Sequence, residues 1–261
     1  MRIQENLRIT LAQVELVWQN PKQNRQNFEV QIMQLSGKSD LVIFPETFTT
    51  GFAMNSPESA ESMDGPTINW MKKLSQKSGM ALAGSLLIND NNLCYNRFVF
   101  ITPLGEISCY DKRHLFSIGG ESNLLTSGTN RQIVCYLGWR IGLYICYDIR
   151  FPVWCRNIDD TDLIIFTANW PDSRQQVWET LLKARAIENQ VYVAGVNRIG
   201  TDGEVIYYSG GSQVINPKGE VLSPMSVTGD HLFSYEISIQ ELNHFRKKFP
   251  VGNDADQFII K

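Results

Sequence analysis

The chain has 261 residues, of which 43% are hydrophobic and 20% charged, and its formal net charge is −3. This length and apolar content are enough for a sizeable hydrophobic core, and we expect residues 1–261 to form a single domain. Because the charge is nearly balanced and occurs in no long block of one sign, we expect neither nucleic acid nor an anionic membrane as a partner.

The number and spacing of the cysteines and histidines argue against disulfide bonds and against a metal site. The five cysteines are odd in number and contain no C-x-x-C pair, so we expect neither a disulfide framework nor a zinc site. The three histidines are scattered, and we therefore expect no metal and no cofactor. The N-terminus lacks the apolar stretch of a signal peptide, and no window of about 18 apolar residues occurs, which predicts a cytoplasmic protein.

Helix and strand signals alternate along the chain. Two helices are expected to begin at Pro21 and Pro66, each with proline at the first helical position, and to end at Gly37 and Gly79. A longer helix is expected over 173–189, and the tail after Phe245 has no regular pattern. Alternating or apolar runs predict strands at 7–14, 41–44, 80–88, 95–101, 107–110, 133–136, 140–145, 163–167, 191–197, 204–208, 212–215 and 220–222.

Some of these strand segments are apolar throughout. The runs at 41–44 and 163–166 contain no alternation of polar and apolar residues, which is typical of strands buried on both faces. Helices must then cover one face of the sheet, and another layer must cover the other. The later strands favour two sheets packed together with helices outside, a layered α/β fold.

Three chemically reactive side chains each follow a predicted strand. Glu46 comes after the apolar run that ends at residue 44, Lys112 after a hairpin strand, and Cys146 after the strand at 140–145. A thiol needs a nearby base or cation to become a nucleophile, and a carboxylate at a dry site has its pKa raised toward neutrality. A lysine could stabilise an oxyanion, so the set suggests hydrolysis of a carbon–nitrogen bond.

Each of these residues also has a structural explanation. Cys146 could be a small buried hydrophobe, as most free cysteines are, Glu46 a helix-capping acid and Lys112 a surface cation. It is their occurrence together, each with a characteristic local sequence, that favours catalysis.

The local sequences resemble the three signature segments of the nitrilase superfamily, the carbon–nitrogen hydrolases. They are Phe44-Pro-Glu46, Tyr110-Asp-Lys112-Arg-His-Leu115 and Ile145-Cys146-Tyr-Asp-Ile-Arg-Phe-Pro152. Their order and spacing match, and the segment Ala184-Arg-Ala-Ile-Glu-Asn189 is also similar to that family. Within it, the chain looks most like the ω-amidase branch, which hydrolyses the terminal amide of 2-oxo acid amides such as 2-oxoglutaramate and 2-oxosuccinamate.

The resemblance implies a four-layer α-β-β-α sandwich of two mixed sheets and a homodimer packed through the helices that flank them. It also implies a mechanism, in which Glu46 takes the Cys146 proton and the sulfur attacks the amide carbon. Lys112 and the backbone N–H of Tyr147 would hold the oxyanion. Glu46 would then protonate the departing ammonia and activate the water that hydrolyses the thioester.

A fourth catalytic residue is expected at Glu121, which follows two glycines and stands where the family often has a second glutamate. It could position Lys112 or the substrate ammonia, and the alternative is an acidic residue on a surface loop.

Residues that bind the rest of the substrate are harder to assign. The guanidinium of Arg150 could pair with a substrate carboxylate, although a salt bridge to Asp148 would also explain it. Arg174, at a helix start, is a weaker rival. Trp170 and Phe48 are expected to wall the pocket, although aromatic side chains are more often part of the core.

Other functions remain open. The motifs do not separate an ω-amidase from an amidase for deaminated glutathione, a carbamoylase or a nitrilase, because these share fold and reaction machinery. A non-catalytic scaffold would not need Glu46, Lys112 and Cys146 together. A cysteine protease would need a histidine base, and the histidine near a motif, His114, stands close to Lys112 in the sequence rather than to the cysteine.

Overall fold

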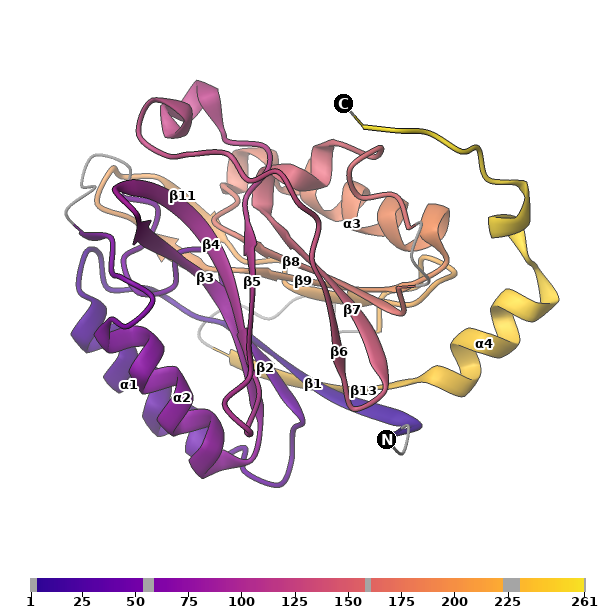
Figure 1. The fold of residues 1–261 in the computed structure, drawn as a ribbon, viewed down its shortest axis with the longest axis horizontal. Helices are drawn as coiled ribbons and strands as arrows, with labels where there is room; N and C mark the ends of the chain where they lie inside the picture. The colour runs from indigo at the N-terminus through magenta and orange to yellow at the C-terminus, as the bar shows by residue number, and fades with distance from the viewer. Residues whose placement is uncertain (1–3, 54–58, 158–160, 223–230, 261) are drawn as a thin grey trace.

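The computed structural model describes residues 4–53, 59–157, 161–222 and 231–260. Two mixed sheets of six and five strands pack face to face, with helices on both outer sides (Figure 1). This arrangement confirms the expected α/β sandwich with four layers in the order α-β-β-α. Its two sheets bring strand ends from distant parts of the chain to one place.

The first sheet has the strand order β13-β1-β2-β3-β4-β5. Its strands are β1 (Asn6–Gln13), β2 (Leu41–Ile43), β3 (Ala81–Asp90), β4 (Leu93–Ile101), β5 (Ile107–Asp111) and β13 (His231–Ser238). β1, β2 and β3 run parallel, and the remaining neighbours pair antiparallel. The parallel centre is what the unbroken apolar run at 41–44 predicts, since such strands are covered on both faces.

Helices α1 (Pro21–Met33) and α2 (Pro66–Ser78) cover the outer face of this sheet (Figure 1). Each begins with proline, as expected, and α2 is capped at its C-terminus by Gly79, whose φ of 73° is the left-handed conformation that glycine adopts without strain. The buried side chains of both helices meet those of β2 and β3 in one apolar cluster. α1 ends at Met33, before the expected stop at Gly37, because the intervening residues form turns.

The second sheet has the strand order β12-β9-β8-β7-β6. Its strands are β6 (Ile133–Tyr136), β7 (Trp139–Ile145), β8 (Leu163–Ala168), β9 (Tyr192–Asn197) and β12 (Gln213–Ile215). Its central strands β7, β8 and β9 are parallel. Helix α3 (Gln175–Asn189) packs on its outer face, where a Cβ on Gly195 would come within 2.6 Å of Leu182, so glycine permits this close approach.

The core between the sheets is built from apolar side chains of both inner faces. Leu7, Ile9 and Ile43 of the first sheet belong to one buried cluster with Leu143 and Ile165 of the second. Because these side chains are fully buried and packed together, the two sheets hold each other in a defined position. The carboxyl ends of β2, β7 and β8 are thereby placed side by side.

Two of the expected strands differ from the sequence expectation. The strand expected at 204–208 is instead part of a hairpin of β10 (Ile199–Thr201) and β11 (Tyr207–Ser209). Its turn is organised by the Asp202 carboxylate, which accepts the N–H groups of Glu204 and Ile206. The strand expected at 220–222 is reduced to a single bridge between Ile215 and Val221.

The C-terminal part is more regular than expected. Strand β13 pairs with β1 along its whole length, and helix α4 (Ile239–Lys248) follows it directly. The Ser238 side chain caps α4 by accepting the N–H of Glu241. The expectation of an irregular tail from Phe245 is therefore wrong up to Lys248. A short 3-10 turn at Val251–Asp254 comes after it.

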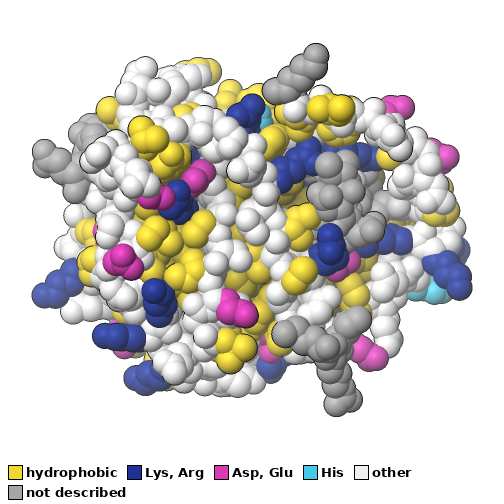
Figure 2. Space-filling model, in the orientation of Figure 1, with side chains coloured by type: hydrophobic (Ala, Val, Ile, Leu, Met, Phe, Trp, Pro, Cys, Tyr) yellow, Lys and Arg dark blue, Asp and Glu magenta, His cyan; other side chains and the backbone are white. Residues whose placement is uncertain are grey.

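On the face drawn in Figure 2, Lys and Arg side chains lie at several places with Asp and Glu between them. Among the described residues, no helix is both long and apolar enough to cross a membrane. Nor do three or more His, Cys, Asp or Glu side chains in this part of the chain gather in a way that could hold a metal ion.

Candidate active site

Three of the sequence-predicted residues lie together where strands of both sheets end. Glu46 is three residues beyond β2, Lys112 directly follows β5, and Cys146 directly follows β7. Lys112 Nζ lies 2.8 Å from Glu46 Oε1, and the Cys146 thiol is close enough to Glu46 for the carboxylate charge to raise the pKa of the thiol. Carboxylate, amine and thiol thus lie close together although they are far apart in the sequence.

Hydrogen bonds from both sheets hold the Glu46 carboxylate. Its Oε1 accepts from Asn96 Nδ2 at 2.8 Å, and its Oε2 accepts the backbone N–H of Asn169 at 2.9 Å. The Asn169 side chain also donates to the backbone oxygen of Glu46 at 2.8 Å. Since Asn96 is on β4 and Asn169 follows β8, the carboxylate is fixed in orientation and fully buried.

Glu121 is part of the same buried group. It begins a 3-10 turn (Glu121–Asn123), and its two oxygens lie 3.1 and 2.8 Å from Lys112 Nζ. Oε2 also accepts the N–H of Phe116 at 2.6 Å, and Oε1 accepts from Asn96 at 3.1 Å. Burial raises the pKa of Glu121, and the adjacent Lys112 opposes that rise. The structure therefore brings Glu121 to Lys112 instead of leaving it on a surface loop.

The amine of Lys112 lies between two carboxylates. Burial alone would lower the pKa of Lys112, but the negative charges of Glu121 and Glu46 outweigh it and raise this pKa above its ordinary value. The amine consequently stays protonated at neutral pH. The cluster holds a permanent positive charge, within reach of the thiol, in a place from which bulk water is excluded.

Replacement of Lys112 by methionine is expected to lower the free energy of unfolding by about 3–5 kcal/mol, because two buried carboxylates lose their cation. Urea unfolding followed by circular dichroism measures this change. Lys22→Met, at an exposed position on α1, is the control and should change stability by less than about 0.5 kcal/mol. Equal stabilities of the two variants would contradict the charge arrangement described here.

The backbone at Cys146 is unusual. Its φ is 44°, in the left-handed region that costs a non-glycine residue about 1–2 kcal/mol. The strand turns there into the 3-10 helix η4 (Cys146–Arg150). The buried Asp148 carboxylate secures this turn by accepting the N–H of Ile145 at 3.1 Å, the hydroxyl of Tyr110 at 2.7 Å and the N–H of His114 at 2.9 Å. Asp148 therefore braces the loop that presents the thiol.

The thiol is protonated in the resting protein. Burial, followed by the negative charge of Glu46, raises the pKa of Cys146 well above its usual range, and Lys112 only partly offsets this. Because the neutral thiol is a weak nucleophile, its proton must leave as it attacks. Glu46, whose charge acts on the thiol at close range, is the base available to accept that proton.

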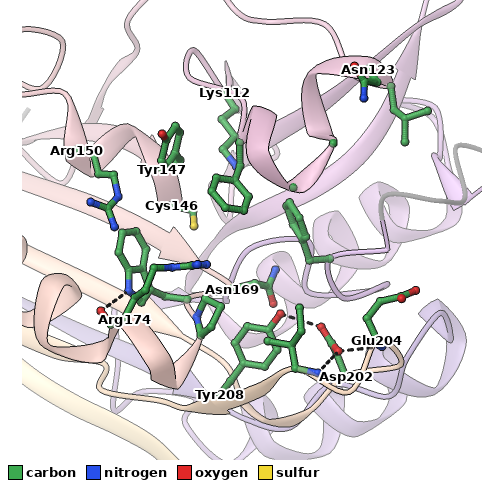
Figure 3. A pocket seen from close by; sticks show the side chains of 18 residues that line it. Lys112, Asn123, Cys146, Tyr147, Arg150, Asn169, Arg174, Asp202, Glu204 and Tyr208 are labelled. Carbon is green, nitrogen blue, oxygen red and sulfur yellow. Dashed lines mark hydrogen bonds between the residues drawn. The ribbon is translucent and has the colours of Figure 1, made fainter.

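A pocket of about 730 Å³ opens beside Cys146 (Figure 3). This size suits a small organic ligand. Much of its wall is aromatic, from Phe52, Phe116, Tyr147, Trp170 and Tyr208. Its charged lining residues are Lys112, Arg150, Arg174, Asp202 and Glu204. The pocket thus combines a reactive end with a wall that carries further positive charge.

Arg150 lies in this wall without a carboxylate partner in the described part of the chain. Its guanidinium lies over the Trp170 ring, 5.0 Å from the centroid, and 6.0 Å from the centroid of Tyr147. The alternative of a salt bridge to Asp148 is not realised, since no ion pair joins them. Arg174 also lines the pocket, with its guanidinium 5.4 Å from the centroid of Phe116.

Phe48 does not reach the pocket, which corrects the sequence expectation. Its ring is fully buried against Phe44 and Phe28, with centroid distances of 4.5 and 5.7 Å, in the core beneath α1 and α2. The chain turns after it, helped by Gly51 with a φ of 72°. Phe52 consequently lines the pocket instead, with its ring centroid 5.6 Å from Lys112 Nζ.

Besides Phe52, sequence reasoning missed Asn169, Asn96 and Phe116, which also belong to the site. Asn169 comes directly after β8, just as Cys146 comes directly after β7. A search for polar residues that follow a predicted strand, which identified the cysteine, could therefore have found Asn169. Asn96 has a weaker signal, as a buried amide inside a strand. Phe116 has no local signal, since its place depends on the loop that carries Glu121.

Comparisons with known proteins agree with this geometry. Residues 8–247 match the family model of the carbon–nitrogen hydrolases. The chain is 43% identical to Omega-amidase YafV of Escherichia coli (strain K12) over 252 residues, which cover 97% of this chain and 98% of that protein. It is 32% identical to the 2-oxoglutaramate amidase of Bacillus subtilis (strain 168) over 253 residues, covering 94% and 96%.

A solved structure is also closely similar. It is XC1258 from Xanthomonas campestris, a CN-hydrolase superfamily protein with an arsenic adduct in its active site. The two folds agree with a TM-score of 0.96 at 40% sequence identity, over 99% of this chain and 100% of that one. The chain therefore belongs to the carbon–nitrogen hydrolase family, as an amide-hydrolysing enzyme, and its resemblance to the ω-amidases is confirmed.

Proposed function

We propose that this enzyme cleaves the terminal amide of small 2-oxo dicarboxylic acid monoamides, 2-oxoglutaramate and 2-oxosuccinamate, to the acid and ammonia. One observation carries the proposal: the pocket that begins at Cys146 also contains the guanidinium of Arg150, which has no acidic partner in the described chain. A substrate with an amide at one end and a carboxylate at the other would place the amide at Cys146 and the carboxylate at Arg150. The names of the E. coli and B. subtilis relatives support the same substrate class.

In the first half of the reaction, Glu46 accepts the thiol proton while Cys146 Sγ attacks the amide carbon. The carbonyl electrons move to oxygen, and the resulting oxyanion is stabilised by the Lys112 ammonium and the backbone N–H of Tyr147. Glu46, now protonated, gives its proton to the amide nitrogen as the carbon–nitrogen bond breaks. Ammonia leaves and a thioester remains on Cys146.

In the second half, water replaces ammonia. Glu46 accepts a proton from this water, whose oxygen attacks the thioester carbon, and the same proton then returns to the sulfur as the carboxylic acid departs. Glu121 acts through Lys112, since both its oxygens contact that amine and its backbone hydrogen bond fixes their position. It keeps the lysine charged and aimed at the oxyanion in both steps.

The far end of the substrate is held by Arg150. A planar guanidinium can donate two parallel hydrogen bonds to a carboxylate, and such charge-assisted pairs are stronger than neutral ones. Trp170 lies under this guanidinium and Tyr147 beside it, so both keep it directed at the pocket and provide apolar walls for the substrate's methylene groups.

Arg150→Ala is expected to raise KM for 2-oxoglutaramate roughly 10- to 100-fold, since one charged hydrogen-bonded pair contributes about 1.5–3 kcal/mol. The kcat/KM for a neutral amide of the same length, such as pentanamide, should change by less than about threefold. Steady-state ammonia release gives both values. Equal losses for the charged and the neutral amide would remove Arg150 from carboxylate recognition.

A substrate panel tests the function as a whole. We expect ammonia release from 2-oxoglutaramate and 2-oxosuccinamate to exceed that from glutamine, a carbamoyl amino acid, deaminated glutathione and a simple nitrile. Preference for the carbamoyl compound would identify a carbamoylase, and preference for deaminated glutathione would identify an amidase for that compound. Either result would replace the substrate proposed here but leave the roles of Glu46, Lys112 and Cys146 unchanged.

A further inference from the structure

Two arginines enter the active-site pocket from the same side (Figure 3). Arg150 comes from η4, and Arg174 ends the 3-10 turn η5 (Asp172–Arg174) that precedes α3. Trp170 joins them, because its ring supports the Arg150 guanidinium and its Nε1 donates to the backbone oxygen of Arg174 at 2.8 Å. Trp170 thus contacts the guanidinium of Arg150 and the backbone of Arg174, while the Arg174 guanidinium lies over the Phe116 ring.

These two arginines differ from those whose guanidinium groups bind oxygens of the protein itself. Arg113, Arg131 and Arg198 also lie over aromatic rings, but each donates to backbone oxygens. Five others each form an ion pair with an aspartate or glutamate: Arg8, Arg25, Arg97, Arg185 and Arg246. In the part of the chain that the structure describes, Arg150 and Arg174 have aromatic faces as partners and no acid. An aromatic ring contacts the flat face of a guanidinium and leaves the N–H groups at its edge free to bind oxygen.

Of the two acidic lining residues, Asp202 is engaged within its own hairpin. The Asp202 carboxylate already accepts the N–H groups of Glu204 and Ile206 and the hydroxyl of Tyr208, the last at 2.8 Å. Figure 3 shows Asp202 and Glu204 on a different side of the pocket from Arg150 and Arg174. The side of the pocket from which Arg150 and Arg174 enter is therefore positive.

We propose that Arg174, together with Arg150, makes the pocket select amides of 2-oxo acids and reject amides of 2-amino acids. This inference rests on the proposed function and assigns its specificity to a second residue. A 2-oxo acid presents two carboxylate oxygens and an adjacent oxo oxygen, all acceptors. Arg150 binds the carboxylate and Arg174 binds the oxo oxygen. A 2-amino acid presents an ammonium group at that carbon, which two guanidinium charges repel.

The test uses Arg174→Gln and three amides of equal length: 2-oxoglutaramate, glutaric acid monoamide, which lacks the oxo group, and L-glutamine. For the variant, kcat/KM should fall about 10- to 100-fold with 2-oxoglutaramate, as expected for loss of a charge-assisted hydrogen bond. It should fall less than about threefold with the monoamide and stay equal or rise with glutamine. The preference for 2-oxoglutaramate over glutamine should therefore drop by at least about tenfold.

Two further variants separate recognition from structure. Arg174→Lys keeps the charge but not the planar guanidinium, so it should reject glutamine as the wild type does while recovering only part of the activity on 2-oxoglutaramate. Arg140→Gln, at an exposed position near the start of β7, is the matched control and should leave all three values unchanged. A uniform loss on all three amides with Arg174→Gln, or no loss at all, would overturn the proposal.

Binding measurements keep this inference separate from the proposed function. If the wild type does not hydrolyse 2-oxoglutaramate, the proposed function is wrong, but Arg174 can still be examined by calorimetric titration with 2-oxoglutarate and glutarate. Tighter binding of 2-oxoglutarate that disappears in Arg174→Gln supports the role of Arg174. Equal affinity for both acids in the wild type overturns it.

Discussion

Cys146→Ala is expected to abolish ammonia release from every amide that the enzyme hydrolyses. Without the sulfur no thioester can form, and the uncatalysed attack of water on an amide is too slow to measure beside it. The fold should persist, because alanine fills nearly the same space and the turn at this position is held by Asp148 rather than by the thiol. Ammonia assays at high enzyme concentration, with circular dichroism as the check on folding, measure both effects.

Cys135→Ala provides the matched control, because Cys135 is a free cysteine at an exposed position on β6. It should retain full activity. Turnover by Cys146→Ala that approaches the wild-type rate would exclude a covalent intermediate on Cys146. Loss of activity in both variants would mean that cysteine replacement itself damages the protein.

Glu46→Gln is expected to lower kcat by about 10²–10⁴-fold, the usual contribution of a general acid–base group. The amide has nearly the same shape but cannot take the thiol proton. Both Glu46 oxygens accept hydrogen bonds, from Lys112 and Asn96 on one side and from the Asn169 N–H on the other. In either orientation, the glutamine NH₂ therefore faces a donor, and we also expect a lower free energy of unfolding.

The same variant tests the second half of the reaction. If any acylation takes place, hydrolysis of the thioester lacks its base, and an acyl adduct should accumulate on Cys146. Intact-protein mass spectrometry after incubation with 2-oxoglutaramate, followed by peptide mapping, would detect and locate it. Glu188→Gln, which alters a carboxylate paired with Arg185 on α3, is the control and should accumulate none. An adduct on another cysteine would assign the nucleophile elsewhere.

Local sequence was sufficient for the reactive residues and for most of the framework. Glu46, Lys112 and Cys146 each follow a strand whose signal is a short run of neighbouring residues, and helix starts at proline are equally local. The unbroken apolar strands indicated burial on both faces, from which the layered arrangement follows. The sequence pattern did not predict β13 and α4, because each buries little apolar surface. β13 is an edge strand with only one fully buried residue, and α4 buries only Leu242.

The tertiary structure decided what surrounds these residues. Asn96 and Asn169 reach Glu46 across 50 and 123 positions of sequence, and no local pattern reports such pairings. Phe48 and Phe52 are alike in the sequence, yet a turn between them sends one into the core and the other into the pocket.

For this protein, then, the sequence by itself determined which residues are the reactive groups, because strand ends and motifs consist of neighbouring residues. The burial that raises the pKa of the thiol, and the absence of an acid beside Arg150 in the described chain, depend on packing between distant segments. Only the folded chain shows which charges are neutralised within the protein and which are left to meet the substrate.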